Sequence, residues 1–185
     1  MDLITVINER RSVRKYRTDP VPDEILIQIL ETARQAPSWA NTQAPRFVVV
    51  KDQTTKNALA ETVGERNPSR QALIDAPCVI CLFGKNESSG YFGGKAATDK
   101  GDWLLFDAGI AMEHLVLAAW NFGLGTVHVG MFDHRAAQAV LQIPDGFEVI
   151  ELTPLGYFDE TPAPKPRRPL EETVFLNTYG QPFKG

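Results

Sequence analysis

GDWLLFDAGIAMEHLVLAAWNFG, residues 101–123, is the stretch around which the rest of the chain is arranged. Its apolar residues are dense and helix-compatible, so the sequence predicts the longest helix of the protein here. Gly123 and Gly125 end that helix. The small side chains that let a neighbouring helix approach closely are Ala108, Ala111, Ala118 and Ala119.

Shorter helices and strands surround this helix in the sequence. The expected strands cover residues 46–52, 77–85, 125–132 and 147–158. The other expected helices follow Asp2 and cover residues 21–37, 54–64 and 133–143. Strands separated by helices predict an α/β or α+β sheet with helices packed on it.

The chain of 185 residues suits one domain, residues 1–185, because neither a repeat nor an internal boundary is visible. Residues 86–100 are rich in Gly and Ser, which indicates a functional lid or a disordered loop. Residues 160–185 form an extended C-terminal arm, since four prolines between residues 162 and 169 exclude regular structure. The arm is expected to lie on its own domain or on a partner subunit.

Composition excludes several classes of protein. The formal net charge of −4 and a pI near 5.4 argue against a general nucleic-acid binder. No uncharged apolar run is long enough for a membrane span, and the first residues lack the pattern of a secretory signal. We therefore expect a cytoplasmic protein.

The familiar catalytic and nucleotide motifs fail. Residues around GGKA lack the first glycine and the hydroxyl of a P-loop, and GLGTVHVG precedes a strand instead of following one. Cys78 and Cys81 form a C-x-x-C, but on a strand their thiols point to opposite faces, which favours structural cysteines over a redox or metal site. No catalytic side chain and no metal ligand are assigned. If the protein is an enzyme, a bound cofactor carries the chemistry.

Two basic clusters stand near the two ends of this acidic chain. RRSVRKY, residues 10–16, and KPRRP, residues 165–169, could grip a phosphate from two sides, because the guanidinium fork matches phosphate oxygens in pairs. The alternatives are a solvated helix end and a solubilising tail. The candidate residues are Arg10, Arg11, Ser12, Arg14, Lys165, Arg167 and Arg168.

The loop PSWANTQAP, residues 37–45, gathers hydroxyl and amide groups between a helix and a strand. Ser38, Asn41 and Gln43 could contact the polar edge of a flavin or pteridine, or could serve only the turn itself. Trp39 could stack on a ring or pack on apolar surface.

Together these motifs resemble the nitroreductase family of flavoproteins. The resemblance rests on RRSVRKY, APSWANTQAPRFVVV, GLGTVHVGMFD, IPDGFEVIELTPLGY and KPRRPLEETV, which occur in the family's order over nearly the whole chain. It implies an α+β fold with a central, mostly antiparallel sheet flanked by helices. It also implies an intertwined homodimer with FMN at the subunit interface.

The resemblance assigns site residues by position. It carries Arg10, Ser12 and Arg14 to the FMN phosphate and ribityl chain, and Lys165, Arg167 and Arg168 to the same phosphate. Pro37, Ser38, Asn41 and Gln43 correspond to a loop that reaches the flavin from the other subunit. Val129 and Gly130 correspond to the backbone beside the reactive face of the ring. Many relatives read N-x-Q-P-W, whereas Ala44, Pro45 and Arg46 follow Gln43 here.

The implied activity is a ping-pong oxidoreductase. NADH or NADPH reduces the flavin and leaves, and a small acceptor such as a nitroaromatic or a quinone is then reduced at the same face. Other readings are a same-fold enzyme for dehalogenation or dehydrogenation, a non-catalytic FMN-binding module, and a basic patch for nucleic acid or an anionic surface.

Overall fold

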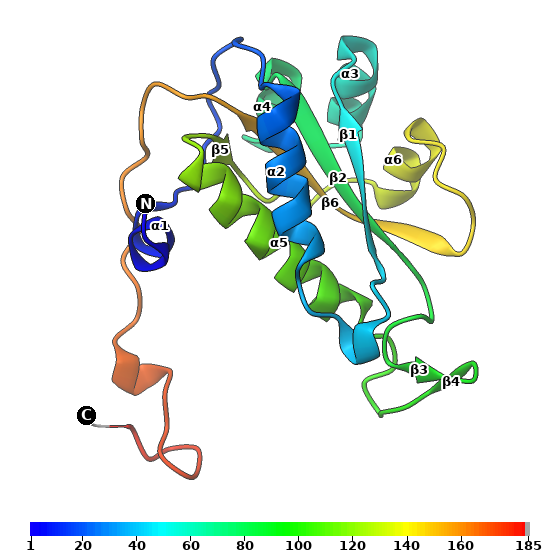
Figure 1. Cartoon of the computed structure of the whole chain (residues 1–185), viewed down its shortest axis with the longest axis vertical. Helices are drawn as coiled ribbons and strands as arrows, with labels where there is room; N and C mark the ends of the chain where they lie inside the picture. The colour runs from blue at the N-terminus through cyan, green and yellow to red at the C-terminus, as the bar shows by residue number, and fades with distance from the viewer. Residues whose placement is uncertain (184–185) are drawn as a thin grey trace.

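The computed structural model describes residues 1–183 and contains a four-stranded sheet with helices on both faces (Figure 1). The strand order is β1-β2-β6-β5, and each neighbouring pair is antiparallel. The fold is therefore α+β, as the family resemblance implies, and not α/β. The strands are β1 (Pro45–Val50), β2 (Cys78–Lys85), β5 (Gly125–Thr126) and β6 (Phe147–Gly156).

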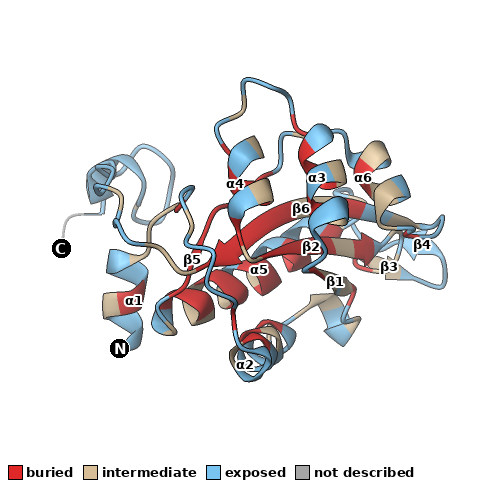
Figure 2. Ribbon diagram, turned by 90° about the horizontal axis from the view of Figure 1, so that it is seen from above, coloured by how far each residue is buried: buried red, intermediate tan, exposed pale blue. Residues whose placement is uncertain are grey.

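Helices cover the two faces of the sheet in separate layers. Figure 2 shows α2 (Asp23–Arg34) and α5 (Leu104–Asn121) on one face, and α3 (Gln53–Glu61), α4 (Arg70–Asp75) and α6 (His134–Val140) on the other. The short helix α1 (Leu3–Glu9) lies beside α5 at one end of the sheet. Two 3₁₀ turns, η1 (Trp39–Asn41) and η2 (Leu170–Glu172), complete the elements.

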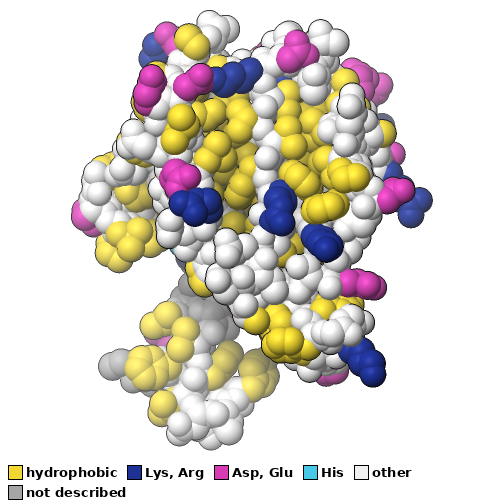
Figure 3. Space-filling model, turned by 45° about the vertical axis from the view of Figure 1, so that its right-hand side comes forward, with side chains coloured by type: hydrophobic (Ala, Val, Ile, Leu, Met, Phe, Trp, Pro, Cys, Tyr) yellow, Lys and Arg dark blue, Asp and Glu magenta, His cyan; other side chains and the backbone are white. Residues whose placement is uncertain are grey.

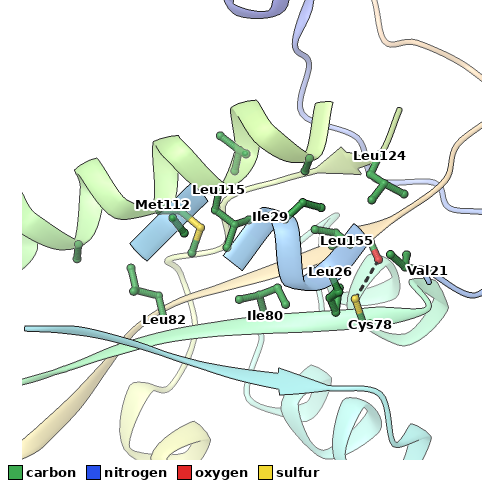
Figure 4. Close-up of a cluster of buried hydrophobic side chains, with 14 residues drawn as sticks. Val21, Leu26, Ile29, Cys78, Ile80, Leu82, Met112, Leu115, Leu124 and Leu155 are labelled. Carbon is green, nitrogen blue, oxygen red and sulfur yellow. Dashed lines mark hydrogen bonds between the residues drawn. The ribbon is translucent and has the colours of Figure 1, made fainter. Parts of the chain in front are cut away.

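Strand β2 is buried on both faces, so its side chains alternate between two hydrophobic cores. Cys78, Ile80 and Leu82 face α2 and α5 (Figure 4), whereas Val79 and Cys81 face the layer of α3, α4 and α6. The two thiols are free, lie on opposite faces, and have pKa values raised by burial to about 12. The expectation of structural cysteines is confirmed.

Capping explains where several helices begin. The carboxylates of Asp2, Asp52 and Asp133 each accept a backbone N–H three residues further on, at the starts of α1, α3 and α6. The apolar stripe of α2 is buried at Leu26, Ile29 and Ala33. Of the helices in residues 1–183, none combines the length and apolar character that a membrane crossing requires.

One local expectation was wrong, and two small elements were not expected. The strand expected at 125–132 is confined to Gly125–Thr126, because beyond it only Val129 pairs with β6. Helix α4 was not expected, since six residues are too few to show a helical period. The loop 86–100 contains a short hairpin, β3 (Tyr91–Phe92) and β4 (Lys95–Ala96).

The arm that follows β6 is extended up to η2 and passes α1 (Figure 1). It exposes apolar side chains, which gather at the lower left of the space-filling view (Figure 3). Its exposed hydrophobic residues are Leu170, Val174, Leu176, Tyr179 and Phe183. Leu3, Ile4 and Ile7 on α1 are also exposed. One chain alone thus leaves two apolar surfaces uncovered.

Candidate functional site

The two basic clusters meet in a single cavity of about 520 Å³, called here the basic hollow. It lies where the end of α1 faces the arm, so residues about 150 positions apart share one wall. Among its described lining residues Glu113 alone is acidic. The predicted residues that line it are Arg10, Arg11, Ser12, Arg14, Lys165 and Arg167. Arg168 does not line it.

The basic hollow has unused capacity for an anion. Arg11 donates from Nη1 to the carbonyls of Asn8 (2.7 Å) and Arg10 (2.8 Å), but its buried Nε has no partner in residues 1–183. Within the same residues none of the five lining cations forms an ion pair. Five facing cations repel one another unless an anion lies between them, so the hollow fits a phosphate.

Residues 10–14 are fixed to the edge of the sheet. Val13 donates its backbone N–H to the carbonyl of Thr126 (2.8 Å), and Ser12 forms a parallel bridge to the same residue. A Cβ on Gly125 would lie 2.6 Å from the Cβ of Val13, so only glycine allows this close approach. Arg14 is held from the other side by the Ser69 hydroxyl, which accepts from its Nε at 3.2 Å.

A second cavity, also of about 520 Å³, lies between α2, β1 and α5. Pro37, Ser38 and Gln43 line it, whereas Asn41 does not. Its wall includes Thr42, whose buried hydroxyl has no partner in residues 1–183. The two cavities share no lining residue, so the described chain does not bring the predicted loop to the basic hollow.

The loop of residues 37–43, called here the flavin loop after the role that the family resemblance implies for it, has an unusual backbone. Ala40, Asn41 and Gln43 have φ values of 45°, 57° and 49°. Non-glycine residues in this region cost about 1–3 kcal/mol each and persist only where the surroundings hold them. Ser38 supplies one such restraint, because its hydroxyl accepts the N–H of Gln43 at 2.8 Å.

Arg46 supplies a second restraint. Its Nη1 donates to the carbonyls of Gln43 (2.5 Å), Ala44 (3.2 Å) and Pro45 (3.2 Å). Arg46, which directly follows the two residues that depart from the N-x-Q-P-W pattern, Ala44 and Pro45, therefore binds the carbonyls of both and that of Gln43 at the end of the flavin loop.

The segment of Val129 and Gly130 combines a fixed residue with an open one. Val129 is buried and exchanges two backbone hydrogen bonds with Leu152, both 3.0 Å long. Gly130 is exposed, and within residues 1–183 its N–H donates to no group. A free backbone donor beside a rigid residue is suited to contact a ligand.

Sequence reasoning missed three polar groups near these features. Asp107 is buried on α5 and binds the flavin loop, and Glu113 lines the basic hollow. His128 Nδ1 lies 2.5 Å from Glu151 Oε1, and this hydrogen bond raises the pKa of His128. A signal existed for Asp107, because a carboxylate interrupts the apolar positions of the long helix.

Comparison with known proteins identifies the family to which this chain belongs. The profile of the nitroreductase family matches residues 7–157, which is most of the chain. The chain belongs to the nitroreductase family. A family member from Thermus thermophilus, named NADH dehydrogenase, is 32% identical over 94% of this chain and 95% of its own.

Other family members extend the likeness. The FMN reductase [NAD(P)H] of Bacillus subtilis is 28% identical, over 96% of this chain and 74% of its own. The iodotyrosine deiodinase of Thermotoga neapolitana is 27% identical over 96% and 98%. The crystal structure of a nitroreductase family protein from Clostridium novyi superposes with a TM-score of 0.78 at 30% identity, covering 99% of this chain and 97% of that one.

Proposed function

We propose that this nitroreductase-family protein is an FMN-dependent oxidoreductase that takes hydride from NADH or NADPH and reduces a small acceptor such as a nitroaromatic or a quinone. The observation that carries the proposal is the basic hollow, in a chain whose family profile covers residues 7–157. Relatives named FMN reductase and NADPH-flavin oxidoreductase support both the cofactor and the reductant.

FMN when bound supplies the redox chemistry, since it accepts hydride from the nicotinamide and delivers it to the acceptor. The chain's own residues bind and orient it. Arg10, Ser12 and Arg14 would hold the phosphate together with Lys165 and Arg167 of the arm. Arg168, which does not line the hollow, is proposed as a phosphate ligand from the family resemblance alone. By fixing the phosphate, these residues would leave one face of the ring open to the reductant and the acceptor in turn, as a ping-pong cycle requires.

The ring would be contacted by the remaining predicted residues. Val129 and Gly130 offer the backbone beside its reactive face, and the free N–H of Gly130 supports that role. Pro37, Ser38, Asn41 and Gln43 would come from the second subunit, as the separation of the two cavities supports.

The proposed assembly is an intertwined homodimer. The apolar residues left exposed on α1 and on the arm are what a second copy would cover. Light scattering after gel filtration should give about twice 20.5 kDa. A mass of one chain would contradict the dimer and the two-subunit site together.

The proposed location is the cytoplasm. Fractionation of cells that express the tagged full chain should recover it with cytoplasmic markers.

The experiment that tests the activity is an anaerobic titration of the FMN-loaded, desalted protein, followed by visible absorption. Addition of NADH or NADPH should bleach the flavin band, and a nitroaromatic or a quinone should restore it. A band that survives desalting but does not bleach would indicate a non-catalytic FMN-binding module. Loss of the band on desalting would contradict the proposed cofactor site.

A second candidate is reductive dehalogenation on the same fold. The deiodinase relative of Thermotoga neapolitana, similar over 96% of this chain, is the observation in its favour. Release of iodide from an iodinated phenol by the reduced protein, faster than reduction of a nitroaromatic, would select this reading.

A further inference from the structure

Asp107 is a buried carboxylate placed between two loops. It is 1% exposed, lies on α5, and forms no ion pair within residues 1–183. Its oxygens accept the backbone N–H of Trp39 at 3.0 and 3.1 Å and the hydroxyl of Ser89 at 2.6 Å. A buried polar group is stable only where it is hydrogen-bonded, so these contacts are specific.

The first contact acts on the flavin loop. Trp39 opens η1, directly before the two consecutive residues with positive φ, Ala40 and Asn41. Asp107 thereby fixes the loop at its entry, while Ser38 closes it at Gln43. Asp107 also lines the cavity that Ser38 and Gln43 line.

The second contact acts on residues 86–101, called here the acceptor loop. Ser89 is fully buried, and its carbonyl accepts the N–H of Trp103 at 3.0 Å. Gly90 follows with φ of 83°, and its missing Cβ would lie 2.5 Å from the Trp103 ring. Ser89 is thus the anchored base of a loop whose tip, the β3–β4 hairpin, is largely exposed.

The two loops also meet through their aromatic side chains. The ring of Trp39 lies edge-on to that of Phe92, with centroids 5.0 Å apart and planes at 62°. In Figure 1 η1 and the β3–β4 hairpin lie beside each other at the start of α5. The contact gives the loops a shared surface, and Asp107 gives them a shared anchor.

We propose that Asp107 is a positioning residue that joins the flavin loop and the acceptor loop into one wall, next to the cavity that Asp107 lines with Ser38 and Gln43, and that this wall contacts the acceptor. The role of the wall toward the acceptor rests on the proposed function, whereas the contacts that build the wall do not. Because one carboxylate holds both loops, loosening either contact changes the other, and the Trp39–Phe92 surface keeps its shape only while both contacts exist.

Three variants separate the contacts. Ser89→Ala removes the hydroxyl contact alone. Asp107→Asn keeps an acceptor for the N–H of Trp39 and serves as the conservative variant, whereas Asp107→Ala removes both contacts. The matched control is Ser88→Ala, since the neighbouring Ser88 side chain makes no hydrogen bond within residues 1–183.

Hydrogen exchange of the flavin-free full chain, followed by mass spectrometry of peptides, tests the wall directly. In Asp107→Ala we expect faster exchange in both residues 37–43 and residues 86–101. Ser89→Ala should accelerate hydrogen exchange strongly in the acceptor loop and to a smaller extent in the flavin loop. The exchange rates of Asp107→Asn should lie between those of Ser89→Ala and those of the original protein. Acceleration in only one loop for every variant would overturn the proposal, whether or not Asp107→Ala folds.

Kinetics of the FMN-loaded protein provide the second readout. Ser89→Ala should raise KM for an aromatic acceptor by no more than about tenfold, the limit that the loss of one hydrogen bond within the wall can set, with kcat within about twofold. A merely structural role would lower the amount of active protein, and therefore kcat, without moving KM. If the original protein binds no FMN, the proposed function fails while the exchange result still decides the wall.

Discussion

The residues that line the basic hollow lead to a quantitative prediction about the dissociation constants of FMN and of riboflavin, which lacks the phosphate. Arg10 follows α1 and Arg167 lies on the arm; both line the hollow, and neither side chain makes a hydrogen bond or ion pair within residues 1–183. Truncating them to alanine therefore removes no contact that holds the described fold together. Arg10→Ala and Arg167→Ala should affect the ligand's phosphate and little else.

The expected size follows from the exposure of the two side chains. Charge-assisted hydrogen bonds contribute about 1.5–3 kcal/mol, and the lower figure applies because Arg10 is half-buried and Arg167 exposed. Each single variant should then raise the Kd for FMN about tenfold, and the double variant about 150-fold. The Kd for riboflavin should stay within about threefold.

Quenching of flavin fluorescence on titration measures both dissociation constants in one buffer. Arg17→Ala is the matched control, since Arg17 pairs with Asp19 and lies outside the hollow. The preference for FMN, expressed as the Kd for riboflavin divided by the Kd for FMN, should also fall with added salt in the original protein but change little in the double variant. Equal losses for FMN and riboflavin would refute the reasoning, because the arginines would then act on the fold and not on the phosphate.

Three further perturbations have defined outcomes. Gly125→Ala should cost about 1–3 kcal/mol in urea unfolding, because the new methyl group collides with Val13; an unchanged midpoint would contradict the close approach. His128→Asn should remove a pH-dependent part of the stability, because Glu151 raises the pKa of His128. The Tm of the original protein should exceed that of the variant by the full amount below about pH 6.5, and this difference should disappear as the pH rises through the raised pKa. A Tm difference that instead grows with pH would contradict this prediction. Lys56→Met should cost about 1–3 kcal/mol in the same urea assay, since the buried Nζ donates to a carbonyl at the end of α4 at 2.6 Å.

Much of the fold was predictable because its signals are local. The α2 stripe and the apolar run of β2 each report their own element, and the opposite directions of Cys78 and Cys81 follow from the two-residue period of a strand. The antiparallel order of the sheet had no local signal and came only from the family resemblance.

The candidate site was predictable where charge was concentrated. Residues 10–14 and 165–167 stood out against an acidic background, and they line one cavity. Asp107 was missed because its role depends on Trp39 and Ser89, which lie 68 and 18 positions away. The left-handed backbone of Ala40 could not be predicted, since alanine carries no sequence signal for positive φ.

The basic hollow draws its cations from residues 10–14 and residues 165–167, and this imposes an order in time. On the ribosome the second group is made about 8–30 s after the first. Until then the growing chain carries only the three arginines of residues 10–14, and the basic hollow is incomplete. On the proposed function, FMN can therefore stabilise only a chain that has been translated as far as the arm, and proteolytic removal of the arm would abolish that stabilisation.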